Sequence, residues 1–193
     1  MREAVRSIPV WYWLVLILAV VFGVLFCSFT IVVFRALLIE APSLLPERAG
    51  LQAQRVPLQP PWHVRAGESP PFEWNSDPPT SGWHDPVPAR AAVYREPVPD
   101  ANLVHSLEHG YVIISYNCGD LSQEECDELV RKLEDLFVRF GGFKLIVVPR
   151  PTLESRIALT AWGWIDKFDE YDEGRIVAFI NARRDKGPED TPE

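Results

Sequence analysis

The sequence predicts an α/β fold, α+β-like, with the order strand, helix, strand, strand, helix and both helices on one face of a small sheet. A proline-rich irregular segment and one N-terminal transmembrane helix precede it. Three observations predict this organisation. Residues 11–34 form an apolar run without a charged side chain, and 13 of the 18 prolines lie between residues 41 and 100. Beyond residue 109, short β-rich runs alternate with stretches in which apolar residues recur at helical spacing.

The apolar run predicts one membrane-spanning helix over residues 10–35. A helix needs about 20 mostly apolar residues to cross a bilayer, and this run is long enough. Trp11 and Trp13 are typical of the aromatic belt at a membrane interface. A cleaved signal peptide is disfavoured because its apolar core has only about 7–15 residues. A lipid-bearing Cys27 is disfavoured because the bulky Phe26 precedes it. The lipid bilayer is therefore an expected partner.

The rest of the chain predicts a single tethered domain. The segments are a short N-terminal arm at 1–9, a proline-rich stalk at 36–67, the α/β domain at 68–188 and an acidic tail at 189–193. Arginines on the two sides of the apolar run are nearly balanced, so the positive-inside rule decides little. We expect a single-pass protein of the cell membrane with its arm in the cytoplasm and its domain outside, because the cysteines favour that side.

Each regular element of the domain has its own signal. Three β-rich apolar runs predict strands at residues 111–116, 143–148 and 156–162. Between the first two, Ser122 and Glu125 form a capping-box pattern that opens a helix, and Gly141-Gly142 ends it. A second helix begins after Asp172 and carries an apolar stripe.

The order of these elements predicts the topology of the sheet. A helical crossover joins the first two strands, so we expect them to be parallel neighbours. Pro149 and Pro151 permit a tight reversal into an antiparallel third strand. Both helices should then cover one face. The acidic stretch 166–173 is interpreted as a solvated approach to the second helix.

Charge and cysteine placement restrict the function. The net charge is −8, and without a basic surface no nucleic-acid partner is expected. Cys118 and Cys126 are close in sequence and are predicted to form a disulfide, which persists only in an oxidising compartment. Two buried, reduced thiols are the alternative. A thioredoxin-like redox pair is disfavoured because the spacing is not C-x-x-C.

All four histidines lie between residues 63 and 109. His105, Glu108 and His109 form an H-x-x-E-H pattern, and His84 lies in a turn further upstream. On a helix, His105 and His109 would share one face. Imidazole and carboxylate groups suit zinc or copper, so His84, His105, His109 and Glu108 are the predicted metal ligands.

Two other interpretations of these residues stay open. H-x-x-E-H is also the signature of the inverted zinc peptidases, but that signature needs a long helix, and Gly110 follows directly. Alternatively, His84, His105 and Glu108 only hydrogen-bond the irregular segment to the domain. The sequence has no nucleophile elbow, phosphate-binding glycine loop or dinucleotide fingerprint. No catalytic residue is assigned, and an enzyme is the less favoured class.

Several motifs resemble those of a known family. They are Asn75-Ser-Asp-Pro-Pro-Thr-Ser-Gly82 followed by His84, then Pro97-Val-Pro99, Leu103-Val-His105, Leu107-Glu-His-Gly110 and Arg156-Ile-Ala-Leu-Thr-Ala-Trp-Gly163. Over residues 68–188 the chain resembles the bacterial domain-of-unknown-function 3105 family. The resemblance implies a membrane-anchored or exported bacterial protein and brings no established activity.

Three functions follow, in order of preference. The first is a membrane-anchored protein whose outer domain binds a zinc or copper ion. The second is a structural or accessory subunit of a membrane protein complex, with the apolar helix as its docking element. The third is a metal-dependent hydrolase that uses the His/Glu set.

Overall fold

The computed structural model describes residues 11, 13–15, 17–23, 26, 52–65 and 67–192. The chain divides into two compact units, residues 1–44 and residues 45–193. In the first unit the described residues are helical, and Cys27 lies outside them, as do the N-terminal arm and most of the predicted stalk. Within the described part of the chain, no helix has both the length and the apolar character needed to cross a membrane.

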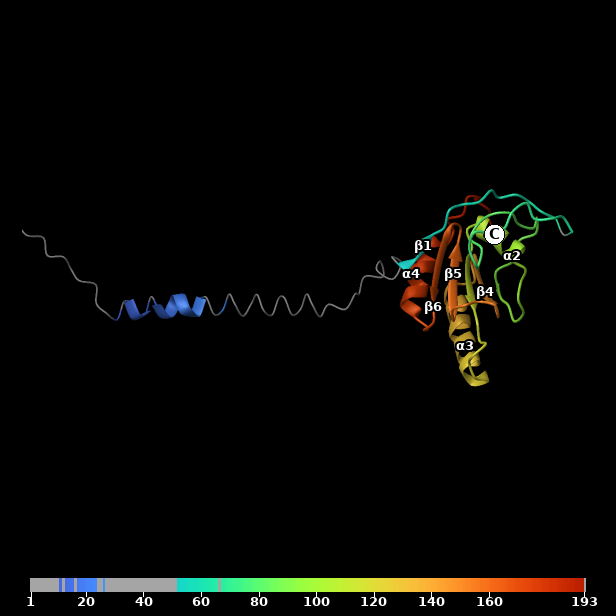
Figure 1. The fold of residues 1–193 in the computed structure, drawn as a ribbon. Coiled ribbons are helices and arrows are strands. Elements are labelled where there is room, and N and C mark those ends of the chain that lie inside the picture. Colours follow the sequence, from blue (N-terminus) through green and yellow to red (C-terminus); the bar gives the residue numbers. More distant parts are fainter. Residues whose placement is uncertain are drawn as a thin grey trace, which may run out of the picture. The chain divides into compact units, whose positions relative to one another are not determined.

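The second unit is a mixed α/β fold built on one open, six-stranded sheet (Figure 1). Its elements are β1 (Gln54–Arg55), β2 (Ala92–Val93), α2 (Asp100–Glu108), β3 (Val112–Tyr116), α3 (Gln123–Arg139), β4 (Leu145–Pro149), β5 (Ile157–Ala161), β6 (Trp164–Phe168) and α4 (Glu173–Arg183). The strand order is β1-β6-β5-β3-β4-β2. The three predicted strands correspond to β3, β4 and β5, and the two predicted helices to α3 and α4.

The pairing of the central strands follows the predicted topology. β3 and β4 are parallel, and β5 is antiparallel to β3. The reversal after β4 therefore places β5 on the far side of β3 rather than beside β4. β3 becomes the centre of the sheet, and all five of its residues are buried.

Successive side chains of β3 point to opposite faces of the sheet, so the core has two layers, one on each face. Val112, Ile114 and Tyr116 pack in the layer that contains the buried residues of α3 and α4. Ile113 packs in the other layer, against Leu107 of α2. α3 and α4 thus share one face, as predicted, but α2 lies on the opposite face, so the expectation of helices on a single face has to be corrected.

The interpretation of residues 166–173 as a solvated approach was wrong for its first part, because Trp164–Phe168 is the strand β6. Asp166 is only 3% exposed, and it accepts hydrogen bonds from the Nε and Nη2 atoms of Arg175 in α4. An acidic residue can lie inside a sheet when a guanidinium neutralises it with two bonds. Because that partner comes from a later helix, the local sequence did not reveal it.

The corner between β3 and α3 is fixed by two local devices. Ser122 and Glu125 form the predicted capping box, in which each side chain accepts a hydrogen bond from the backbone amide of the other residue. Cys118 and Cys126 form a disulfide. Closing a loop of this length stabilises the fold by roughly 2–3 kcal/mol on the chain-entropy estimate. The predicted disulfide is confirmed.

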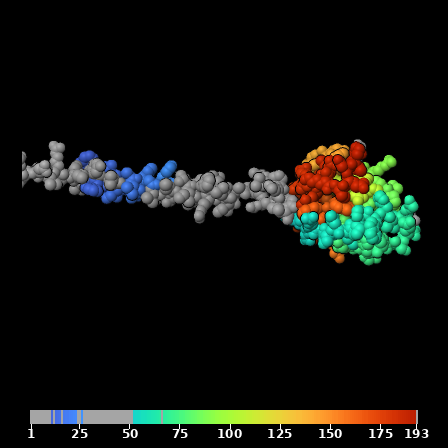
Figure 2. Space-filling model, turned by 90° about the horizontal axis from the view of Figure 1, so that it is seen from above, coloured from blue at the N-terminus to red at the C-terminus, as the bar shows by residue number. Residues whose placement is uncertain are grey.

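The folded unit extends upstream of residue 68, into the predicted stalk. β1 pairs with β6 through Gln54 and Arg55. Further along, His63 forms a β-bridge with His84. In the space-filling view the residues after 52, coloured teal, form a continuous part of the surface (Figure 2). The end of this proline-rich segment is therefore part of the domain.

Candidate metal centre

Helix α2 supplies two candidate ligands, His105 and Glu108. It begins after Pro99 and ends at Glu108, and Gly110 in the turn that follows has a φ of +83°, which suits a residue without a Cβ. Residues three apart on a helix lie on one side, so His105 and Glu108 project together. Both are nearly buried, at 6% and 5% exposure. The short helix permitted by the sequence is therefore present, and it presents an imidazole and a carboxylate to the same space.

Two irregular segments bring His63 and His84 to that space. The Val64 amide donates to the His84 carbonyl at 2.8 Å, and the His84 amide donates to the Trp62 carbonyl at 2.9 Å. These two bonds hold the segments side by side and place the two imidazole centroids 4.8 Å apart. His84 is fully buried, whereas His63 is exposed.

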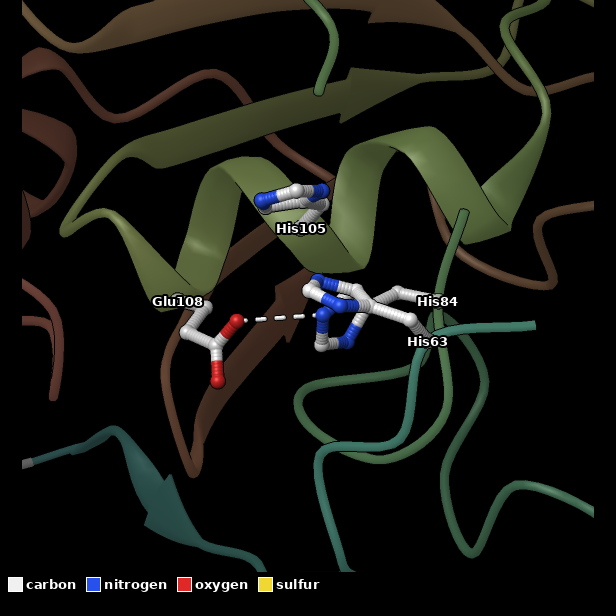
Figure 3. Close-up of side chains that lie close together, drawn as sticks. All are labelled: His63, His84, His105 and Glu108. Carbon is white, nitrogen blue, oxygen red and sulfur yellow. Dashed lines mark ion pairs between the residues drawn. The ribbon is translucent and has the colours of Figure 1, made fainter. Parts of the chain in front are cut away.

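The four side chains form one compact cluster (Figure 3). One ligand atom from each of His63, His84, His105 and Glu108 lies within 4.8 Å of the ligand atoms of the other three. These four residues form the inner cluster. Their separation in sequence, from 63 to 108, means that only the tertiary fold assembles the inner cluster.

Hydrogen bonds fix the tautomers of the two buried imidazoles. His84 Nδ1 lies 2.9 Å from the Gly82 carbonyl oxygen, and His105 Nδ1 lies 2.7 Å from the Asp85 carbonyl oxygen. A carbonyl only accepts, so Nδ1 must carry the proton in both rings. In the neutral rings both Nε2 atoms therefore present a lone pair. A ligating histidine has this arrangement, with the second nitrogen held by a carbonyl.

The His84 Nε2 atom faces Glu108. The distance to Oε2 is 3.0 Å. Among the described residues, however, no group meets the angular requirements for a hydrogen bond to this nitrogen. A buried nitrogen without a well-directed partner needs an explanation, such as an ion that the atom would bind.

Burial sets the charge state of the cluster. It is the main cause of a lowered pKa at His84 and His105, and the neighbouring imidazoles lower both further, although the Gly82 and Asp85 carbonyls oppose the shift. Burial, with a smaller contribution from the charge of Glu189, raises the pKa of Glu108 to about 7. The lowered pKa of His84 and of His105 favours the neutral ring, which is the form of histidine that binds a metal.

His109, the fourth predicted ligand, lies beside the inner cluster rather than in it. Its Nε2 atom is 3.1 Å from His105 Nε2 and 3.2 Å from Glu189 Oε2. The structure therefore brings His84, His105 and Glu108 together as predicted, adds His63, and places His109 behind His105. The assignment of these residues as ligands stays a prediction.

The comparison with known families adds a name for the domain. Residues 63–193 match the family model described as a protein of unknown function, DUF3105. The chain belongs to this family. The DUF3105 region begins at His63 and contains the whole inner cluster. No curated protein and no solved structure matches the chain.

Sequence reasoning missed His63 in this DUF3105 domain because it was assigned to the stalk. One signal could have found it: Trp62-His63 and Trp83-His84 are two Trp-His pairs in irregular segments. The alternative of structural hydrogen bonding holds for the Nδ1 atom of His105, which bonds α2 to the irregular segment at Asp85. The Nδ1 atom of His84 bonds Gly82 within the irregular segment itself. Neither bond uses the Nε2 atoms, which leaves them for a ligand.

Proposed function

We propose that the chain is a membrane-tethered protein that binds a zinc or copper ion through His63, His84, His105 and Glu108, outside the cytoplasm. The observation that carries the metal site is the fixed orientation of His84 and His105. Both rings donate Nδ1–H to backbone carbonyls, which leaves Nε2 without a proton, and His84 Nε2 faces the Glu108 carboxylate.

The donor set favours borderline metals. Three imidazoles and one carboxylate suit zinc or copper(II), and the inner cluster has no thiolate. Bonds of 2.0–2.1 Å place tetrahedral ligands about 3.3 Å apart. The 3.0 Å separation of His84 Nε2 and Glu108 Oε2 is close to this value. All ligand atoms of the inner cluster lie within 4.8 Å of one another, so small movements of the side chains would complete the shell.

The metal site is tested with asparagine variants of the full-length chain. In His84→Asn and His105→Asn, the amide nitrogen can keep the bond that Nδ1 makes to the carbonyl, while the Nε2 atom is lost. We expect both variants to stay folded and to bind zinc and copper at least about 100-fold more weakly, since ligand loss should cost at least as much as loss of an outer partner.

Isothermal titration and metal content after purification measure this effect. Asn102→Ala, on the same helix but outside the inner cluster, serves as the control. If the wild-type chain binds neither metal, or if the asparagine variants bind as tightly as the wild type, the proposed site is wrong.

The membrane tether is supported by the apolar run at residues 11–34 and by the disulfide of Cys118 and Cys126. We expect the full-length chain to remain in the membrane pellet after an alkaline carbonate wash. A chain that begins at residue 45 should be released instead. In cells whose outer layers have been removed but whose cell membrane is intact, added protease should digest the domain. Recovery of the intact chain in the soluble fraction contradicts this proposal.

A further inference from the structure

The C-terminal segment returns to the turn that follows α2. The Asp185 amide donates to the Gly110 carbonyl at 2.7 Å, and the Glu189 amide donates to the Glu108 carbonyl at 3.1 Å. Asp185 also forms an ion pair with the buried Lys144, with Nζ and Oδ1 2.6 Å apart. Figure 1 shows the chain ending beside α2. Residues 185–189 are called the C-terminal strap below.

The strap brings a second carboxylate to the histidines. Glu189 Oε2 lies 3.2 Å from His109 Nε2, which lies 3.1 Å from His105 Nε2. Both separations are close to the distance of about 3.3 Å between adjacent ligands of tetrahedral zinc. His105 belongs to the inner cluster as well, so its ring connects the two groups.

Exposure falls steadily along this series of side chains. The side chain of Glu189 is 51% exposed and that of His109 is 17% exposed, whereas those of Glu108 and His84 are 6% and 0% exposed. His63 is also exposed, but an imidazole has no negative charge with which to attract a cation. Glu189 is therefore an anionic group at the solvent side of the histidine series.

We propose that Glu189 and His109, with His105, form an outer metal position through which a divalent cation is loaded into the inner cluster. The cation is first held by the Glu189 carboxylate and the His109 imidazole. His105 Nε2 has one lone pair, so it serves the outer and the inner position in turn. The ion then passes to His84 and Glu108, and the outer position is free again.

This inference rests on the proposed metal site and makes a kinetic prediction of its own. A loading position speeds both arrival and departure of the ion, so its loss should slow both without changing the affinity. In Glu189→Gln the backbone bond to Glu108 is kept. We expect the association and dissociation rates for Cu²⁺ to fall together, each by about tenfold.

Stopped-flow quenching of tryptophan fluorescence by Cu²⁺ in the full-length chain measures these rates, because Trp62 and Trp83 adjoin His63 and His84. His109→Gln should give the same result as Glu189→Gln. Asp190→Asn removes the same charge one residue further along and should leave both rates unchanged.

The outcomes separate the two proposals. A wild-type chain that binds no Cu²⁺ overturns the metal site itself. A wild-type chain that binds Cu²⁺, with unchanged rates in Glu189→Gln, overturns only the outer position. Faster dissociation at an unchanged association rate makes Glu189 a ligand of the bound state and also overturns it. If Asp190→Asn lowers the rates as much as Glu189→Gln does, and high salt abolishes the difference, the effect is a long-range electrostatic attraction. This result also overturns the outer position.

Discussion

Replacing Glu108 by glutamine is expected to stabilise the metal-free protein above pH 7 and to remove most of its affinity for zinc or copper. Burial raises the pKa of Glu108 to about 7 from an ordinary value of 4.5. Between these values the folded protein keeps a proton that the unfolded chain releases. The wild type therefore loses stability as the pH rises through this range, and Glu108→Gln does not.

The size of this effect follows from the shift. The stability of Glu108→Gln relative to the wild type should increase by about 3 kcal/mol between pH 4 and pH 8 in the presence of a chelator. Urea unfolding at several pH values measures it. Glu154→Gln, at an exposed position, is the control for the loss of a carboxylate.

Adding metal should reverse the order of stability. The wild type gains about 4.1 kcal/mol when the free metal is at 1,000 times its dissociation constant, which exceeds the advantage of the variant at pH 8. Glu108→Gln has lost its anionic ligand and should gain little at that concentration. If the variant is less stable than the wild type at pH 8 without metal, Glu108 is not held at an unfavourable, buried position. If the variant gains as much from metal as the wild type, Glu108 is not a ligand.

Replacing Gly187 by alanine is expected to detach the C-terminal strap. A Cβ at this position would lie 2.8 Å from the carbonyl carbon of Glu108, and closer still to its oxygen and to the Gly110 nitrogen. Backbone atoms cannot move aside as a flexible side chain can. We expect the free energy of unfolding to fall by about 3 kcal/mol, at the upper end of the range for an overpacked site.

Hydrogen exchange locates this effect. The amides of Asp185 and Glu189, which donate to the Gly110 and Glu108 carbonyls, should lose their protection in Gly187→Ala. Gly174→Ala in α4 is the matched control, because a Cβ there meets only an Asp172 side-chain oxygen at an ordinary 3.4 Å. Unchanged protection of the strap amides in Gly187→Ala would show that the strap is not packed as described.

Sequence motifs predicted the parts of the fold that depend on interactions between residues close together in the chain. The capping box at Ser122 and Glu125 and the disulfide at Cys118 and Cys126 each involve residues close together in sequence. The parallel pairing of β3 and β4 follows from a helical crossover between adjacent strands. None of these features depends on a distant partner.

Features that depend on distant partners were missed. β6 has a buried Asp166, which breaks the usual pattern of a strand and is tolerated only because Arg175 reaches it from α4. His63 was assigned to a stalk because proline density suggests an extended linker. Its place in the inner cluster depends on two backbone bonds to the segment around His84.

Motifs and periodicity within short stretches of chain were enough to predict the family, the main strands and helices, and three of the four residues of the inner cluster. The folded chain was needed to show that His63 joins them, that His109 lies behind His105, and that Glu189 returns from the C-terminus to meet His109. These positions depend on long-range backbone hydrogen bonds, which form only once the chain has folded.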